Sequence, residues 1–237
     1  MRSKGFTRRA FLAASGGVAG MLAAAGTVSL PAQGAVPAEK EGAAVSPAED
    51  LMREHGVLRR ILLIYEEWVR RLGLHQDSEA GSFVESAGII RSFVEDYHEK
   101  LEEEYLFPRM KKIGTLADLV DVLLRQHQAG RRLTAITLRL SGPRVLRNSE
   151  NRSRLSGCLR QFIRMYRPHA AREDTVLFPA FHEMLEEHEY DVLGDAFENK
   201  ENELFGENGF EHMVARVESI EKKLGIYDLA RYTPPEP

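Results

Sequence analysis

Apolar residues recur at steps of three and four along most of the chain between residues 47 and 224, the pattern of helices that each bury one face. The core-facing positions predicted for the first such stretch are Leu51, His55, Leu58, Leu62, Tyr65, Val69 and Leu72. Those predicted for a later stretch are Leu155, Leu159, Phe162, Tyr166, His169, Glu173 and Val176. Histidine and glutamate therefore stand at positions that helix packing turns toward the core.

Turn and cap residues divide this pattern into four long helices, at about 47–72, 80–107, 115–141 and 150–178. Two shorter helices are expected to follow, at about 189–204 and 208–224. The lengths of the long helices match well enough for consecutive ones to run antiparallel. We therefore predict an all-α fold, an up-down-up-down antiparallel four-helix bundle with two additional C-terminal helices.

Individual residues mark the predicted helix ends. Ser46 is expected to cap the first helix. Thr115 is expected to cap the third, in a capping box with Asp118 in the usual glutamate position. Pro108 is expected to end or kink the second helix, and Pro168 to kink the fourth.

Two segments, 98–108 and 169–179, share the pattern His-x-x-x-Glu-acid-x-x-Leu-Phe-Pro at an offset of 71 residues. A lone histidine precedes each segment, and these two histidines, His55 and His127, are 72 residues apart. Self-similarity at one period indicates a duplicated unit. Each unit contributes a single histidine and then a His-x-x-x-Glu pair.

Residues four apart on a helix share a face, so each pair aims an imidazole and a carboxylate at one point. Such groups are costly to bury unless they pair with one another or bind metal. The helix lengths place all four helices' polar positions at one height in the bundle, within about one turn. The candidate metal ligands are therefore His55, His98, Glu102, His127, His169 and Glu173. The alternative is a polar core layer satisfied by its own hydrogen bonds.

Imidazole and carboxylate without thiolate favour iron, with manganese as the alternative, over structural zinc. A c-type haem is excluded because the chain has no Cys-x-x-Cys-His, and a bis-histidine haem would leave both glutamates unexplained. Four histidines and two glutamates suit a pair of transition-metal ions, and six ligands for two ions leave coordination positions open.

These residues and the two Leu-Phe-Pro endings make the segment 47–185 resemble the hemerythrin-like, or HHE cation-binding, family. The resemblance implies an antiparallel four-helix bundle around a non-heme di-iron centre, with Glu102 and Glu173 bridging the two irons. Oxygen-carrying hemerythrins have a fifth histidine four residues after the third, and here that position is Arg131. The departure argues against reversible oxygen carriage. We expect Arg131, and its counterpart Arg59, to turn out of the seam toward a surface acid.

The N-terminal segment 1–34 resembles a twin-arginine export signal, with Thr7-Arg8-Arg9-Ala10-Phe11-Leu12 followed by a long uncharged run. We expect a periplasmic or otherwise exported protein with no stable membrane insertion once the signal is cleaved; the alternative is anchoring through an uncleaved signal. A flexible spacer at 35–46 follows, then the bundle at 47–185 and a C-terminal helical extension at 186–237. Removing the four basic residues of the signal takes the net charge from −4 to about −8. That balance carries no basic footprint for nucleic acid.

The sequence favours an exported di-iron protein that binds a small ligand such as O2, NO or peroxide. An oxidase, peroxidase or NO-reducing enzyme of the cell envelope is the second hypothesis, and a metal-responsive or storage protein without turnover is the third. Cys158 is expected to be a packing residue, since a single cysteine forms no internal disulfide. The remaining histidines are expected to be solvated: His75, His182, His188 and His212.

Overall fold

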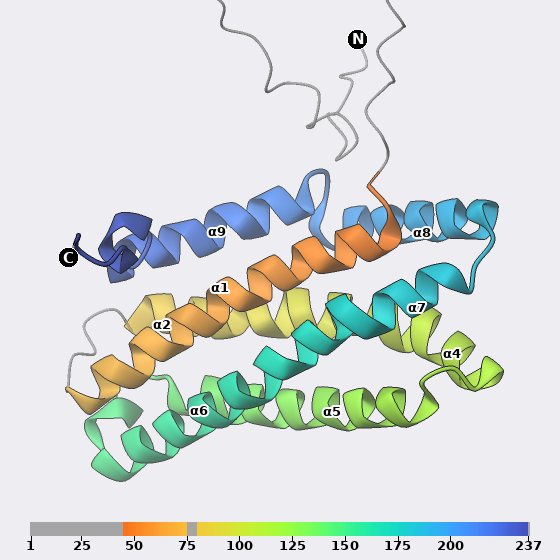
Figure 1. Cartoon of the computed structure of the whole chain (residues 1–237). Coiled ribbons are helices and arrows are strands. Elements are labelled where there is room, and N and C mark those ends of the chain that lie inside the picture. The colour runs from red at the N-terminus through yellow and green to blue at the C-terminus, as the bar shows by residue number, and fades with distance from the viewer. Residues whose placement is uncertain (1–44, 75–79, 237) are drawn as a thin grey trace, which may run out of the picture. The chain divides into compact units, whose positions relative to one another are not determined.

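The computed structural model describes residues 45–74 and 80–236, and every regular element within those residues is helical. The predicted export signal, all but the last two residues of the predicted spacer, and His75 lie outside the described residues. Four long helical units form a bundle, and two further helices, α8 and α9, lie along one side of it (Figure 1). The predicted all-α bundle with two additional C-terminal helices is confirmed.

The first unit is α1 (Pro47–Gly73) and the third is α5 (Ala117–Leu140). The second runs through α2 (Ala80–Ile89), η2 (Ile90–His98), α3 (Glu99–Leu101), η3 (Glu102–Leu106) and α4 (Phe107–Ile113). The fourth runs through α6 (Ser149–Arg172), η5 (Glu173–Leu177) and α7 (Phe178–Glu183). Both α1 and α5 pack against η2 and against α6, so each unit has two neighbours around a common core.

The caps of α1 agree with the sequence, because the Ser46 side chain accepts a hydrogen bond from the Glu49 backbone and Gly73 is the last residue. The capping box predicted at Thr115 is wrong. The Thr115 backbone N–H instead bonds to the Met110 carbonyl and so closes α4, next to the left-handed Gly114. Leu116, also left-handed, then begins α5 without a side-chain cap.

Pro108 does not end the second unit, which continues to Ile113, and the fourth unit likewise continues past Pro179 to Glu183. Each proline is the second residue after a π-helical segment, η3 or η5. A π-turn shifts the backbone hydrogen bonds by one residue, so the carbonyl that a proline ring would strike in an α-helix is displaced. The repeated Leu-Phe-Pro therefore marks a π-helical turn rather than a helix end.

The two C-terminal helices are α8 (Glu187–Phe205) and α9 (Gly209–Leu224), and both contact α1. Phe197 of α8 and Val217 and Ile220 of α9 are fully buried, so the extension shares the bundle core. Short 3-10 turns lie at Val145–Arg147 and Leu229–Tyr232. Among the described helices, none is both long and apolar enough to span a membrane.

Candidate metal centre

All six predicted ligand residues come together in the bundle core, and each is at most 4% exposed. His55 lies on α1, His127 on α5 and His169 near the end of α6. His98 ends the π-helical η2, and the two glutamates, Glu102 and Glu173, begin η3 and η5. The predicted convergence of four helices at one level is thus what the structure contains.

The side chains form two groups that are each suited to a cation: His55, His98 and Glu102 in one, and His127, His169 and Glu173 in the other. The ring centroids of His55 and His98 are 4.7 Å apart, and those of His127 and His169 are 5.0 Å apart. Each group therefore joins two imidazoles from neighbouring helices.

The two carboxylates lie between these histidine pairs. Glu102 Oε2 is 3.9 Å from His98 Nε2 and 3.4 Å from His127 Nε2. Glu173 Oε2 is 3.1 Å from His169 Nε2 and 3.3 Å from His55 Nε2. Each glutamate thus faces one histidine of each pair, which is the arrangement that bridging two cations requires.

The inward-facing atoms are buried without hydrogen-bond partners among the described residues: His55 Nε2, His98 Nε2, His127 Nε2 and both carboxylate oxygens of Glu102 and Glu173. Buried polar atoms in proteins are almost always hydrogen-bonded or coordinated. A polar layer satisfied by itself would not leave these atoms unpaired. The donor set, its burial and its unpaired atoms therefore fit metal ions.

A proton occupies part of this site when no cation does. Burial raises the pKa of the Glu102 carboxyl well above its usual value, and repulsion from Glu173 adds to the effect. Burial also lowers the pKa of His98, and lowers that of His127 to about 4. Burial acts against the charge of His55 too, but the hydrogen bond to Asp174 and the nearby Glu173 carboxylate outweigh it and raise the pKa to about 9. Cation binding would displace the protons that these side chains hold in its absence.

The outward-facing Nδ1 atom of each histidine meets an acceptor from another helix. His55 Nδ1 lies 2.6 Å from Asp174 Oδ1, and His127 Nδ1 lies 3.1 Å from Glu103 Oε1. These acids directly follow Glu173 and Glu102 in the repeated motif. A carboxylate at Nδ1 fixes the tautomer that leaves Nε2 free for metal and raises the basicity of the ligand.

The other two histidines are held by the residue that precedes a lone histidine. His98 Nδ1 lies 2.8 Å from Glu54 Oε2, and His169 Nδ1 lies 2.8 Å from Gln126 Oε1. Sequence reasoning did not assign these four partners. Their signal was present, because the acid after each glutamate and the polar residue before each lone histidine both repeat.

The phenylalanine of each Leu-Phe-Pro also contacts the centre. Phe107 stacks on His127 with ring centroids 5.6 Å apart, and Phe178 stacks on His55 at 5.5 Å. Each repeat thus supplies a core glutamate, an acid and a phenylalanine that all meet the lone histidine of the other half. This explains why the motif extends beyond its two ligands.

Arg131 and Arg59 do not enter the ligand set. Arg131 pairs with Glu103 and with Glu99 at 2.8 Å each, and Arg59 pairs with Asp174. The expectation that both turn toward acids is confirmed, but these acids are not fully at the surface: Glu99 is 1% exposed, and Glu103 and Asp174 are half-buried and hold histidines. Despite burial, these pairs and the neighbouring histidine hold the pKa of Glu103 to about 2 and lower that of Asp174, so both stay anionic at neutral pH.

One side of the centre carries a buried polar network. The Tyr166 hydroxyl donates a 2.5 Å hydrogen bond to Glu99, and the Tyr166 ring lies 5.1 Å from that of His169. Burial raises the pKa of Glu99 to about 8 even though Tyr166 and Arg131 favour the charged form. The equivalent of Glu99 in the second half of the repeat is Ala170, so this network belongs to one half only.

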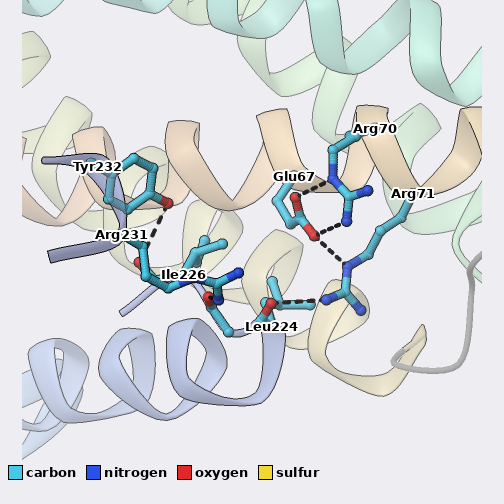
Figure 2. Close-up of a pocket in the computed structure, with 8 residues that line it drawn as sticks. Glu67, Arg70, Arg71, Leu224, Ile226, Arg231 and Tyr232 are labelled. Atoms are coloured by element: carbon cyan, nitrogen blue, oxygen red, sulfur yellow. Dashed lines mark hydrogen bonds and ion pairs between the residues drawn. The ribbon is translucent and has the colours of Figure 1, made fainter. Parts of the chain in front are cut away.

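The other described histidines and the cysteine lie away from the centre, as the sequence predicted. His182, His188 and His212 are exposed, and Cys158 is a buried free thiol. A surface cavity of about 460 Å³ is lined by α1 and the C-terminal segment and contains three arginines (Figure 2). Two of these, Arg70 and Arg71, bond Glu67, and Arg71 also bonds the Leu224 carbonyl at the end of α9. This cavity is thus a structural junction distinct from the candidate metal centre.

The Hemerythrin HHE cation binding domain family matches the chain twice, over residues 46–141 and 118–220. The uncharacterized protein Rv1995 of Mycobacterium tuberculosis (strain ATCC 25618 / H37Rv) is 45% identical over 224 residues, which is 94% of this chain and 88% of that protein. The uncharacterized protein Mb2018 of Mycobacterium bovis matches with the same identity and coverage. No solved structure matches the chain.

Proposed function

The chain belongs to the hemerythrin HHE cation-binding family, and from that premise we propose that it is an exported non-heme di-iron protein that binds a small ligand such as O2, NO or peroxide. Metal binding follows from the family and from its buried histidine–glutamate groups. The identity and number of the ions, the ligand and the export are the proposal.

The observation that carries it is the position of the two glutamates. Each carboxylate lies between a histidine of its own half and one of the other half, at 3.1–3.9 Å, with its oxygens buried and without hydrogen-bond partners. A single ion would leave one histidine pair unused. Two ions use all six ligands, and imidazole with carboxylate favours iron, or else manganese.

The protein's own residues have distinct roles in this proposal. His55 and His98 would hold one ion, His127 and His169 would hold the other, and Glu102 and Glu173 would supply carboxylate ligands to both. When bound, iron supplies open coordination positions and redox chemistry. The carboxylates and amide at the Nδ1 atoms keep every imidazole in the tautomer that binds metal.

Arg131 argues for ligand binding rather than oxygen carriage. It stands where oxygen carriers have a fifth histidine, and its guanidinium, which does not coordinate metal, is held by Glu99 and Glu103. One ion therefore keeps a coordination position that an external ligand can occupy.

A second candidate function is a peroxide- or NO-consuming enzyme, and the pair of Tyr166 and Glu99 favours it. A buried phenol hydrogen-bonded to a carboxylate, next to the ring of a candidate ligand, is placed to move a proton near the centre. A binding protein without turnover has no need of such a pair.

Metal analysis of protein purified after growth with iron tests the main proposal. We expect two irons per chain, and a plateau at one or fewer would contradict it. Steady-state consumption of hydrogen peroxide and of NO by the iron-loaded protein then separates the two functions: turnover that Tyr166→Phe lowers supports the enzyme, and spectral binding without turnover supports the ligand-binding protein.

Export is tested with the paired arginines of the N-terminal segment. Replacing Arg8 and Arg9 with lysine should keep the protein in the cytoplasm, because twin-arginine signals depend on both. Cell fractionation of the parent and the double variant provides the comparison. Equal distribution of the two proteins would contradict the export proposal.

A further inference from the structure

The four residues that bond the histidine Nδ1 atoms follow the twofold repeat, with one exception. Asp174 and Glu103 are equivalent, both are carboxylates, and both are neutralised by an arginine, Arg59 or Arg131. The other two partners, Glu54 and Gln126, are also equivalent, but one is a carboxylate and the other an amide. The two halves of the centre therefore differ in charge at one hydrogen bond.

The exception affects one histidine pair only. His55 and His98 both have a carboxylate at Nδ1, whereas His169 of the other pair has the Gln126 amide oxygen at the same 2.8 Å separation. A hydrogen bond to an ionised acceptor is about twice as strong as one between neutral groups. A carboxylate also draws positive charge onto the imidazole more effectively, which strengthens its bond to a metal ion.

The other charged groups facing the pair of His127 and His169 do not replace the missing carboxylate. Glu99 lies 4.0 Å from His127 Nδ1, too far for a hydrogen bond, and its own bonds go to Tyr166 and Arg131. No described acid other than Glu173 pairs with His169. The amide at residue 126 thus remains the difference that acts directly on a candidate ligand.

We propose that the two metal positions are unequal: that of His55 and His98 binds a divalent cation more tightly and fills first, and that of His127 and His169 is the weaker position because of Gln126. This inference rests on the proposed two-metal centre. Loss of such a partner typically costs ten- to a hundredfold in metal affinity, so we expect affinities that differ by about that factor.

The test is an anaerobic titration of the metal-free full chain with cobalt(II), followed by the cobalt absorption bands and by competition with a chelating dye. In the parent we expect two binding steps. Their dissociation constants should differ by more than the statistical ratio expected for two identical sites. Gln126→Glu should increase the cobalt affinity of the weaker step about ten- to a hundredfold and leave the affinity of the tighter step unchanged. Glu54→Gln should weaken the tighter step by a similar factor.

Matched controls place the same charge changes elsewhere on the same helices. Gln128→Glu adds an acid to the exposed face of α5, and Glu49→Gln removes one from the exposed start of α1. Neither should move a step by more than about twofold, since exposed charges are screened. Circular dichroism and thermal unfolding of each metal-free variant confirm that it is folded before titration.

The outcomes separate this inference from the proposed function. Fewer than two cobalt ions per folded parent chain would overturn both. Two ions with the affinities of identical sites, or a weaker step that Gln126→Glu leaves unchanged, would overturn the inequality and leave the two-metal centre standing. A Glu54→Gln effect confined to the weaker step would overturn the assignment of which position is tighter.

Discussion

Gly130 on α5 lies against the phenol of Tyr166 on α6, so closely that a Cβ at residue 130 would overlap the tyrosine hydroxyl and ring. Gly130 is buried within a helix, where glycine otherwise costs stability. The absence of a side chain here allows the two helices to hold Tyr166 in place beside Glu99 and His169.

We expect Gly130→Ala to destabilise the metal-free protein by about 1–3 kcal/mol, because the buried ring must shift to admit a methyl group. Urea unfolding at neutral pH measures the free energy of unfolding. Gly157→Ala in α6 is the control: nothing lies within 4 Å of its Cβ position, so it should be neutral or stabilising by up to about 1 kcal/mol.

Repeating Gly130→Ala in a variant that lacks the Tyr166 ring shows whether the overlap with this ring causes the loss of stability. In Tyr166→Leu the ring and hydroxyl are gone, so Gly130→Ala should cost clearly less there than in the parent. An equal cost in both backgrounds would mean that Gly130 is required for another reason.

The two arginines should differ greatly in their contribution to stability. Arg131→Leu leaves the anionic Glu103, which holds His127, and the buried Glu99 without their cation, so we expect a loss of about 3 kcal/mol in the free energy of unfolding. Arg59, whose side chain is 47% exposed, pairs with Asp174 near the surface, and Arg59→Leu should cost about 1 kcal/mol or less. Chemical unfolding of both metal-free variants makes the comparison, and equal losses would contradict it.

The pH dependence of stability should reveal Glu95. Burial raises the pKa of this carboxyl to about 7, outweighing the nearby Thr134 hydroxyl and the charges of Arg91 and Arg131. The folded state therefore keeps a proton that the unfolded state loses near the ordinary value of 4.5. Stability contributed at Glu95 is present below that value and is lost as the pH rises to about 7.

Glu95→Gln removes this titration. Relative to the parent, the metal-free variant should gain about 2.5 kcal/mol in the free energy of unfolding between pH 5 and pH 8. The gain is about 1.4 kcal/mol per pH unit between pH 5 and the folded-state pKa of about 7, and it levels off above that pH. Glu104→Gln, on the exposed face of the same helical unit, is the control. A difference between Glu95→Gln and the parent that stays constant with pH would refute the prediction.

If Glu102 and Glu173 bridge two irons as proposed, they should determine how strongly iron stabilises the fold. A cation that binds the native state at a hundred times its dissociation constant adds about 2.7 kcal/mol of stability. Glu102→Gln and Glu173→Gln should each remove most of the iron-dependent rise in melting temperature. The metal-free protein should tolerate Glu102→Gln well, because burial and repulsion from Glu173 already disfavour the charged form of this carboxyl.

Differential scanning fluorimetry with and without iron(II) under anaerobic conditions makes this measurement. Glu183→Gln, exposed at the end of α7, should keep the full rise. If both core variants also kept it, the bridging role of the glutamates would be wrong.

The helices and the six core residues could be predicted because both depend on spacing along one chain segment. Steps of three and four select a face, and the repeat supplies each polar position twice. The capping box at Thr115 was wrong and Pro108 did not end its helix, both at points where local chemistry admits two outcomes. Thr115 closed α4 instead of opening α5, and π-turns allowed the helix to continue through the proline.

The partners at Nδ1 could not be assigned because each joins two helices. The contact of Glu54 with His98, for example, depends on the register and crossing of α1 and η2, which no spacing within one helix determines. The same holds for Tyr166 and Glu99, which are 67 residues apart. Sequence spacing gave the inward-facing atoms of the centre, and the packing of the helices determined its outer contacts.

The last prediction concerns the position of the missing fifth histidine. Arg131 is fixed by two carboxylates and stays protonated at neutral pH, because the charges of Glu99 and Glu103 outweigh burial and raise its pKa. No imidazole completes the second metal position from this point on α5. We therefore expect azide and NO to change the absorption of the iron-loaded protein at modest concentrations, and O2 to oxidise the centre without a reversible spectral change. Absorption spectra recorded after adding azide, NO or O2, and again after vacuum is applied to the O2-treated sample, make the distinction. If the vacuum restored the original spectrum after O2 and released O2 intact, one open position would suffice for oxygen carriage, and the absence of a fifth histidine would no longer argue against it.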